Sequence, residues 1–382
     1  MQDYNYLKGN CMEITLELTC CKHPPASELP KEWDNNRESL LAYMEKVHIG
    51  VKGFVKNSVT SGWISDAEIT VSGIDHNVTT GQFGDYIRLL LPGSYNITAS
   101  APGRTVVNGE ARLKEVPEET YRKYYRYEEL TGLLKALAQT HPHIANLSSV
   151  GQSVQGRELW VMQITKDPTA EVPGKPKLKY VGNMHGDETV SRQVLVYLIE
   201  YLLDRYGKDD RITKLVDEAD INIMPSMNPD GFEKSVEGDC EGEHGGRENA
   251  RGKDLNRSFP DQFETIDVPM EDVPEVAAVM KWIQDKRFVL SGNLHGGSVV
   301  ASYPFDDSLK HKVTGEYSPS SDDKLFRYLA RSYAEHHPLM KTGEPHCPDT
   351  PDETFKDGIT NGAQWYDVSG KRMYRCSLHG NV

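Results

Sequence analysis

The sequence lacks several features that would assign it to a class at once. No apolar run reaches the ~18 residues of a membrane span, and the first residues, MQDYNYLKGNCMEITLE, have neither the basic start nor the apolar stretch of a signal peptide. Basic residues are scarce, because 43 Lys and Arg stand against 57 Asp and Glu and give a formal net charge of −14. That charge argues against binding to nucleic acid or anionic membranes and is compatible with a cationic substrate.

Cysteine is sparse and is not spaced for metal binding. None of the six cysteines forms a C-x-x-C pair, so a zinc ribbon is not expected. The sequence leaves the disulfide pairing open, and Cys240–Cys347 is the pair that we expect. Acceptor sequons at Asn77, Asn96 and Asn146 hint at a secreted protein, although such triplets also occur by chance in cytosolic chains.

The 382 residues suffice for two domains, or for one large domain and a small one. From about residue 49 to residue 118 the pattern is short strands and turns, punctuated by Gly and Pro and without a helix signal. We therefore expect a small all-β sandwich over residues 49–118.

The rest of the chain has the pattern of an α/β domain. Residues 11–19 alternate as a strand, and helical periodicity follows over 31–48 and from 130 to about 141. Strands and helices then alternate, with strands at 158–164, before His185, at 220–224 and at 288–294, and helices at 190–206, 273–283 and 322–336. Such alternation predicts a mixed, largely parallel sheet with helices on both faces.

Two strand ends carry residues suited to a metal. The strand KLKYVG leads into His-Gly-Asp-Glu, which places His185 and Glu188 three residues apart on one loop. The strand before His295 ends in the same way, with an Asn and then a His in a Gly-rich turn. A catalytic zinc takes three protein ligands of these types and keeps a position for water. A lone His-x-x-Glu is common by chance, but two such strand ends together favour a zinc site.

Further candidates lie on the first strand and on a polar loop. Glu13 and Glu17 share the polar face of the strand at 11–19; we expect Glu13 in water, whereas the pattern leaves the place of Glu17 open. The loop at 246–261 is rich in Arg and Asn, which suits a carboxylate ligand, although a solvated loop is the commoner reading of such a stretch.

These segments together resemble a known family. HGDE, HGGSVVASYPF, LNRSF and EITLEL are similar to motifs of the zinc metallocarboxypeptidases, and within them to the regulatory subfamily of carboxypeptidases N, E, M and D. The resemblance covers roughly residues 1–110 and 124–368. It implies one zinc ion held by His185, Glu188 and His295, with Glu17 as general base and acid. It also implies that the β domain is transthyretin-like.

The resemblance implies roles for six further residues. Arg247 would polarise the scissile carbonyl, and Asn256 and Arg257 would hold the terminal carboxylate of a peptide. Tyr366 would close over the substrate, and Asp306 and Gln2 would form the pocket for a C-terminal Lys or Arg side chain. The expected function is therefore removal of a C-terminal basic residue from peptides and proteins.

The order of the segments departs from the family. The part similar to the start of the catalytic domain follows the β domain, and the part similar to its end comes first. We interpret this as a circular permutation, in which 1–48 is the end of the catalytic domain, 49–118 the β domain, 119–368 the main catalytic part and 369–382 an unassigned tail. A misordered gene model or a fragment of a tandem protein would give the same order.

Other functions stay open at this point. The chain could bind peptides without cleaving them, be an inactive fragment because of its order, or be a zinc acylase acting on N-acyl amino acids. The resemblance implies a monomer in the secretory pathway or outside the cell, with no membrane span in this chain.

Overall fold

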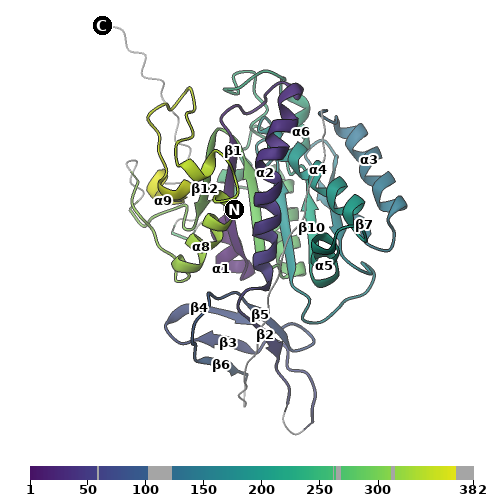
Figure 1. Cartoon of the computed structure of the whole chain (residues 1–382), viewed down its shortest axis with the longest axis vertical. Coiled ribbons are helices and arrows are strands. Elements are labelled where there is room, and N and C mark those ends of the chain that lie inside the picture. Colours follow the sequence, from purple (N-terminus) through teal and green to yellow (C-terminus); the bar gives the residue numbers. More distant parts are fainter. Residues whose placement is uncertain (58–59, 102–122, 261, 264–267, 311–314, 367–382) are drawn as a thin grey trace.

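One mixed eight-stranded sheet organises the molecule. The computed structural model describes residues 1–57, 60–101, 123–260, 262–263, 268–310 and 315–366. The strand order across the sheet is β13-β12-β1-β11-β9-β10-β8-β7 (Figure 1). The four strands β1, β11, β9 and β10 run parallel at its centre, and antiparallel pairs flank them. The predicted mixed α/β class is confirmed. The strands are β1 (Met12–Thr19), β7 (Ala145–Gln152), β8 (Glu158–Ile164), β9 (Lys177–Gly182), β10 (Asp220–Met224), β11 (Leu290–His295), β12 (Ser298–Tyr303) and β13 (Ile359–Asn361).

Helices cover both faces of this sheet. The face that carries α2, α4, α5 and α8 holds the larger apolar cluster, and the other face is covered by α1 and α7. Leu178 and Tyr180 of β9 belong to the first cluster while Val181 belongs to the second, as expected of a strand buried on both sides. The α-helices are α1 (Gln2–Gly9), α2 (Leu29–Met44), α3 (Tyr127–Thr140), α4 (Thr189–Arg205), α5 (Asp210–Glu218), α6 (Pro229–Lys234), α7 (Pro274–Lys286), α8 (Asp323–Ala334) and α9 (Gly362–Trp365).

The first strand of the chain enters the middle of the sheet. β1 is parallel to β11 and antiparallel to β12, although both neighbours arrive more than two hundred residues later. Its apolar side chains, Met12, Ile14, Leu16 and Leu18, pack into the larger cluster. A strand that is alternately apolar and polar therefore sits at a central position, and its polar side must also be buried.

The prediction that Glu13 lies in water is wrong. Glu13 is fully buried, and its carboxylate accepts a hydrogen bond from Lys179 Nζ at 2.7 Å; Lys179 is equally buried and also donates to Ser291 Oγ. The reason is that α1 and α7 cover this face of the sheet. A charge on the covered side is tolerated because its counter-charge comes from β9, which lies beyond β11 in the same sheet.

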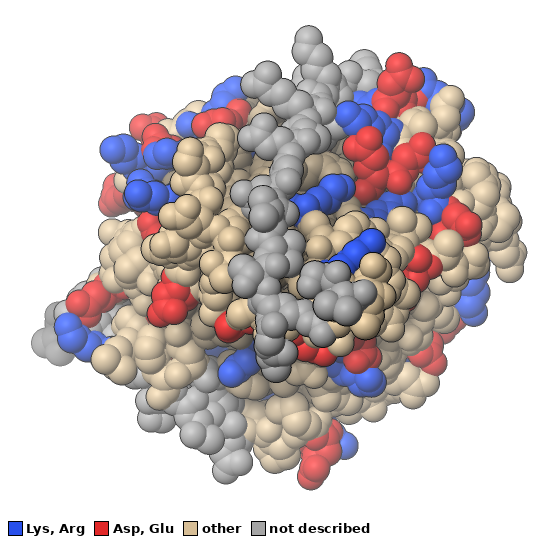
Figure 2. Space-filling model, turned by 90° about the horizontal axis from the view of Figure 1, so that it is seen from below, with Lys and Arg blue, Asp and Glu red and all other residues tan. Residues whose placement is uncertain are grey.

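Residues 51–100 form short strands apart from the main sheet, seen below it in Figure 1. A two-stranded sheet pairs β2 (Val51–Phe54) with β5 (Asp85–Arg88), and a three-stranded sheet has the order β4 (Ile74–Thr79), β3 (Glu68–Val71), β6 (Ile97–Ser100). Val55, Ile69, Val78, Tyr86 and Ala99 belong to their small core. Residues 102–118 of the predicted β domain lie outside the described residues. On the face seen from below, acidic and basic side chains are intermixed (Figure 2).

Two disulfides hold the end of β1, and they correct the expected pairing. Cys20 pairs with Cys347, and its neighbour Cys21 pairs with Cys240, so Cys240 and Cys347 are not joined to each other. Two successive cysteines leave the strand end and reach loops on different sides of it. Such a pairing depends on where the chain arrives in space, which sequence spacing cannot show.

In the part of the chain that the structure describes, no helix combines the length and the apolar character needed to cross a bilayer.

Candidate metal centre and surrounding site

His185, Glu188 and His295 meet at the carboxyl ends of β9 and β11. All three are buried, and a set of their possible ligand atoms lies within 4.8 Å of one another. Glu188 Oε1 is 2.7 Å from His185 Nδ1, and Glu188 Oε2 is 2.7 Å from His295 Nδ1. Two imidazole nitrogens and a carboxylate that converge in this way form a three-ligand set of the type that binds zinc.

The other nitrogen of each imidazole also has the partner that a metal ligand needs. His185 Nε2 lies 3.2 Å from Asp254 Oδ1, and His295 Nε2 lies 2.8 Å from the side-chain amide of Asn293. When Nδ1 binds a metal, Nε2 carries the proton and must donate it. The Asp254 carboxylate accepts directly. The Asn293 amide accepts when its oxygen faces the ring, and that oxygen otherwise has no partner among the described residues. The residues therefore fit zinc.

The loop that carries His185 is held by Asn183. This residue adopts a positive φ of 57°, and its side-chain amide donates to the carbonyls of His185 and Gly186. Ser226 Oγ donates to Asn183 Oδ1 from the end of the neighbouring strand β10. Gly186 lies so close to the backbone of Gly231 that a Cβ there would stand 2.3 Å from it. Asn fits the left-handed conformation, and only Gly fits the close approach.

Glu17 stands beside the metal-binding residues. The parallel register of β1 and β11 makes Glu17 the direct neighbour of His295, and Glu17 is 6% exposed. Burial raises the pKa of the Glu17 carboxyl well above its ordinary value, and the nearby Glu188 raises it further while Arg247 lowers it. One oxygen, Oε2, has no hydrogen-bond partner among the described residues. A buried carboxyl with a free oxygen beside the ligand set is suited to take up and release a proton.

Arg247 reaches the same centre from the loop that follows α6. Its guanidinium contacts His185 Nδ1 at 3.1 Å and Glu188 Oε1 at 3.5 Å, and it donates to Asp254 Oδ2 from two nitrogens. The Asp254 and Glu188 carboxylates keep Arg247 protonated. A fixed cation beside the ligand set can stabilise negative charge that develops on a substrate oxygen.

Asn256 and Arg257 lie a few residues further along the same loop, in a short 3-10 turn that begins at Leu255. Asp254 caps this turn by accepting from Asn256 N at 2.9 Å. Both side chains are half-buried, and Asn256 Oδ1 lies 3.4 Å from the Met1 ammonium group. The positive charge of Arg257 lowers the pKa of both Asp306 and Tyr366, against the effect of burial.

Asp306 and Gln2 come together although 304 residues separate them. Gln2 Nε2 donates to Asp306 Oδ1, and Gln2 Oε1 accepts from Thr15 of β1. Burial raises the pKa of Asp306 to about 6, while the N-terminal ammonium group and Arg257 lower it. The result is a largely enclosed carboxylate with an amide beside it, which suits a cationic side chain.

Tyr366 follows α9 and is the last residue described. It is 39% exposed, and its ring lies 4.7 Å from that of Trp365. Burial and the negative charge of Glu17 raise the pKa of its phenol. The structure thus brings Glu17 and Arg247 to the metal-binding set, and it pairs Asp306 with Gln2 beside Thr15 of β1.

A family comparison agrees with this geometry. The family described as zinc carboxypeptidase matches residues 1–39 and 130–376, which is most of the chain. The chain belongs to the zinc carboxypeptidase family. Zinc is the cofactor of that family, and the His185, Glu188 and His295 set provides the group to hold it.

Curated relatives lie in the subfamily that the motifs resemble. Carboxypeptidase D of Rattus norvegicus is 46% identical over 417 residues, covering 97% of this chain and 30% of that protein. Carboxypeptidase M of Mus musculus is 46% identical over 65% of this chain and 55% of its own length. The carboxypeptidase N catalytic chain of Homo sapiens is 40% identical over 70% of this chain and 63% of its own length.

Solved structures include a carboxypeptidase A from Helicoverpa armigera. It is 19% identical and covers 65% of this chain and 60% of its own, with a TM-score of 0.49. Thrombin activatable fibrinolysis inhibitor is 18% identical and covers 65% of this chain and 61% of its own, with a TM-score of 0.48.

The alignments bear on the order of the segments. The chain spans about 30% of the length of carboxypeptidase D, and one alignment covers 97% of this zinc carboxypeptidase. A single alignment keeps both sequences in order, so the matched segments follow one another in carboxypeptidase D as they do here. The predicted circular permutation is therefore not needed to explain the order.

Several residues of the site were not predicted. Asp254 contacts both His185 and Arg247, and Asp3 accepts from the backbone N–H of Asp306. Glu353 accepts from Ser298 and from the Trp365 indole, and its charge acts on Glu17. The sequence could have predicted Asp254, because it lies two residues before Asn256 in a loop already considered as a carboxylate-binding site. Asp3 and Glu353 carry no local signal.

Proposed function

We propose that this chain is a metal-dependent exopeptidase that removes a C-terminal Lys or Arg from peptides and proteins. The observation that carries this proposal is the register that places Glu17 beside His295, because it puts a proton-exchanging carboxyl next to the metal-binding set. Neither the general base nor the metal ligands would be of use alone.

Each residue has a task in this reaction. Zinc bound by His185, Glu188 and His295 supplies a Lewis acid that lowers the pKa of water and polarises a carbonyl. Glu17 accepts the proton of the attacking water and delivers it to the leaving amine. Arg247 stabilises the developing oxyanion, since its guanidinium already lies against the ligand set.

The substrate is held by groups beyond the metal. Asn256 and Arg257 bind the free carboxylate of the peptide, which restricts cleavage to the last residue. Tyr366 closes over that residue. The preference for a basic side chain rests on Asp306, whose carboxylate lies beside Gln2 in a largely enclosed position.

The remaining predicted parts support the same reading. We assign residues 49–118 to a transthyretin-like domain that docks on the catalytic unit formed by 1–48 and 119–368; the tail at 369–382 lies outside the described residues. Two disulfides favour an oxidising compartment, and the exposed sequons at Asn77, Asn96 and Asn146 are open to glycosylation. We expect a monomer that acts in the secretory pathway or outside the cell.

The test uses the whole chain loaded with zinc and a peptide pair that differs only in its last residue, Arg or Leu. We expect release of the C-terminal Arg, loss of release on chelation, and recovery when zinc is restored. The variant Glu17→Gln should keep peptide binding and lose turnover, with the exposed Glu218→Gln as the control for an equal change of charge.

Two results would replace the proposal. A chain that binds the Arg peptide tightly but never cleaves it is a non-catalytic peptide binder. A chain that ignores both peptides but hydrolyses an N-acyl aspartate is a zinc acylase.

A further inference from the structure

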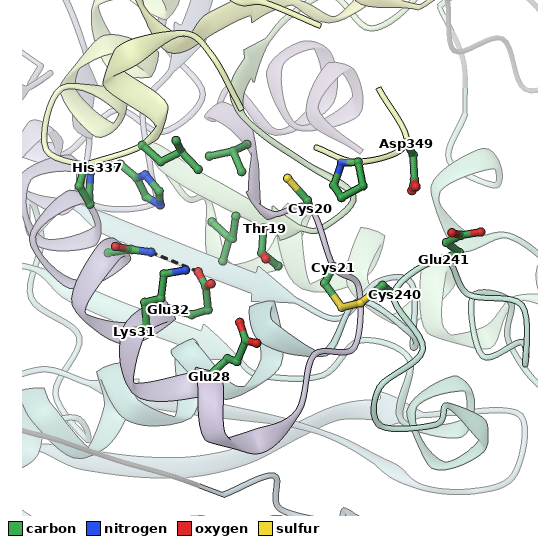
Figure 3. A pocket seen from close by; sticks show the side chains of 16 residues that line it. Thr19, Cys20, Cys21, Glu28, Lys31, Glu32, Cys240, Glu241, His337 and Asp349 are labelled. Atoms are coloured by element: carbon green, nitrogen blue, oxygen red, sulfur yellow. Dashed lines mark hydrogen bonds between the residues drawn. A yellow bond between two sulfur atoms is a disulfide. The ribbon is translucent and has the colours of Figure 1, made fainter. Parts of the chain in front are cut away.

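A cavity lies at the carboxyl end of β1, where the chain leaves the sheet. Its volume is about 850 Å³, and the metal-binding residues are not among the described residues that line it. The end of β1, the start of α2, the segment after α8 and the loops joined by the two disulfides form its walls (Figure 3). A cavity of this size suits a ligand of several functional groups.

The charges around this cavity are mostly negative. Glu28, Glu241 and Asp349 stand at exposed positions, and Glu32 lies deep in the wall with 6% exposure. Lys31 supplies the only cationic side chain among the described residues of the lining. The cavity therefore complements a cation.

Glu32 is a buried carboxylate with little support. Its hydrogen bond from Asn35 is long, at 3.5 Å; burial raises the pKa of its carboxyl, while that hydrogen bond and the charge of the exposed Lys31 lower it. A cation placed beside it would supply the partner that the fold provides only weakly.

His337 adds a donor without an acceptor. It is 1% exposed, and its Nδ1 accepts from the backbone N–H of Met340 at 3.0 Å. The proton of the neutral ring is therefore on Nε2, and Nε2 has no hydrogen-bond partner among the described residues. Burial lowers the pKa of His337 to about 4, so the ring is neutral at pH 7. A carbonyl oxygen of a ligand would satisfy this donor.

The remaining lining is apolar. Leu18, Val299, Leu339, Pro338 and Pro348 contribute side chains between the acidic groups and His337. A ligand that fills the cavity thus needs a cation, an amide carbonyl and an apolar part. A short peptide segment with a Lys or Arg residue next to an apolar residue has all three.

We propose that this cavity is a second binding site for a basic peptide segment, separate from the metal centre. Glu28 and Glu32 bind the cationic side chain, and His337 donates to a backbone carbonyl. Binding at this cavity does not require cleavage, so this proposal holds even if the chain binds peptides without cleaving them.

The test measures binding of N-acetyl-leucyl-argininamide to the full chain by calorimetry. This probe has no free carboxylate, which removes the group that Asn256 and Arg257 would hold. The matched probe contains citrulline, which keeps the shape of arginine and lacks its charge. We expect the arginine probe to bind and the citrulline probe to bind about tenfold more weakly or less.

Four variants locate the probe. Glu32→Gln should weaken binding about tenfold or more, because it removes the buried charge. His337→Asn keeps an acceptor for Met340 N, removes the Nε2 donor and should also weaken binding. Asp34→Asn, an equal change of charge at an exposed position of α2, should leave binding unchanged, as should Asp306→Asn.

Three outcomes overturn the proposal. The first is no binding of the arginine probe to the unmodified chain, and the second is equal binding of both probes. The third is that Asp306→Asn loses binding while Glu32→Gln keeps it, which would place the probe near the metal. If Glu32→Gln fails to fold, His337→Asn and the citrulline probe decide the question.

Discussion

Glu17 of β1 lies directly across from His295 of β11, and the two residues belong to opposite ends of the described chain. The proposed base and one proposed metal ligand therefore meet only when the first strand pairs with a sheet built from later residues. Cys20 and Cys21, which directly follow that strand, are tied by disulfides to Cys347 and Cys240. These bonds favour closure within one molecule.

Closure within one molecule can be tested by complementation. We predict that Glu17→Gln and His185→Ala chains, refolded together, show no peptidase activity, because each site takes β1 from its own chain. The measurement is arginine release by the mixture against each variant alone. Activity in the mixture, with a dimer on size-exclusion chromatography, would show that β1 is exchanged between copies and would contradict the expected monomer.

The docking of the small β strands depends on Arg88 and Asp322. Arg88 Nη2 lies 2.8 Å from both carboxylate oxygens of Asp322, and Arg88 is fully buried. Asp322 precedes α8 and also accepts from Tyr6, whose ring stacks on His76 at 4.0 Å. These contacts join the strands at 51–100 to both the first and the last parts of the catalytic unit.

We predict that Arg88→Met lowers the free energy of unfolding by about 3–5 kcal/mol, since it leaves a buried carboxylate without its cation. Denaturant titration followed by tryptophan fluorescence measures this change. The control is Arg287→Met, which removes more exposed hydrogen bonds to Thr79 and Thr80 and should cost far less. Equal effects of the two variants would mean that the Arg88 pair does not dominate the docking.

The buried Lys179–Glu13 pair makes a different prediction. Lys179→Met and Glu13→Gln should each destabilise the fold by about 3–5 kcal/mol, because each leaves one charged partner buried. The double variant should be more stable than the sum of the two losses predicts, since no unpaired charge remains. Additive losses in a double-mutant cycle would show that the two residues do not interact.

The burial of Glu13 and the disulfide partner of Cys20 could not be predicted from the sequence, in contrast to the first strand and the metal-binding residues. The alternation of residues 11–19 predicted the strand that the structure has at Met12–Thr19, and the strand-end motifs predicted that His185, Glu188 and His295 lie together. Those signals are local, since side-chain periodicity and turn residues lie within a few positions of each other.

Which elements cover a strand depends on residues far away in the sequence. Glu13 was placed in water because nothing nearby in the sequence shows that α1 and α7 pack over it. The same holds for the partners of Cys20 and Cys21, and for Glu353, which reaches the site from a loop without periodicity. Placing Glu17 and Gln2 in the site required the family resemblance, because strand order cannot be derived from alternation alone.

We expect Glu200 on α4 to make the stability of the fold depend on pH. Burial raises the pKa of this carboxyl to about 7, and its Oε2 has no partner among the described residues. In the unfolded chain the carboxyl titrates near its ordinary value of ~4.3. The folded state thus binds the proton more tightly than the unfolded chain. The stability that protonated Glu200 gives the fold is therefore lost as pH rises from about 4 to about 7, and it stays lost above pH 7.

We predict that Glu200→Gln stabilises the protein by about 1–2 kcal/mol at pH 8 and has almost no effect at pH 4. Thermal unfolding of both forms across this range measures the difference. The exposed Glu218→Gln serves as the control and should show no such trend. A stabilisation that is the same at pH 4 and pH 8 would mean that charge burial is not its cause.

We predict that Asp254 strengthens the binding of zinc through its contact with His185. Its Oδ1 accepts from His185 Nε2, which keeps Nδ1 free of a proton and directed at the metal. Asn at this position could still cap the turn at Leu255 but would lose the negative charge. We therefore expect Asp254→Asn to bind zinc about 10–100-fold more weakly in a competition titration against a chelator.

The matched control is Asp272→Asn, which removes a carboxylate paired with Arg251 and Lys253 on the surface. It changes the net charge equally, so it separates the effect of the hydrogen bond to His185 from that of the overall charge. Equal zinc affinity in the two variants would remove Asp254 from the support of the metal centre. It would leave Asp254 only its contacts with Arg247.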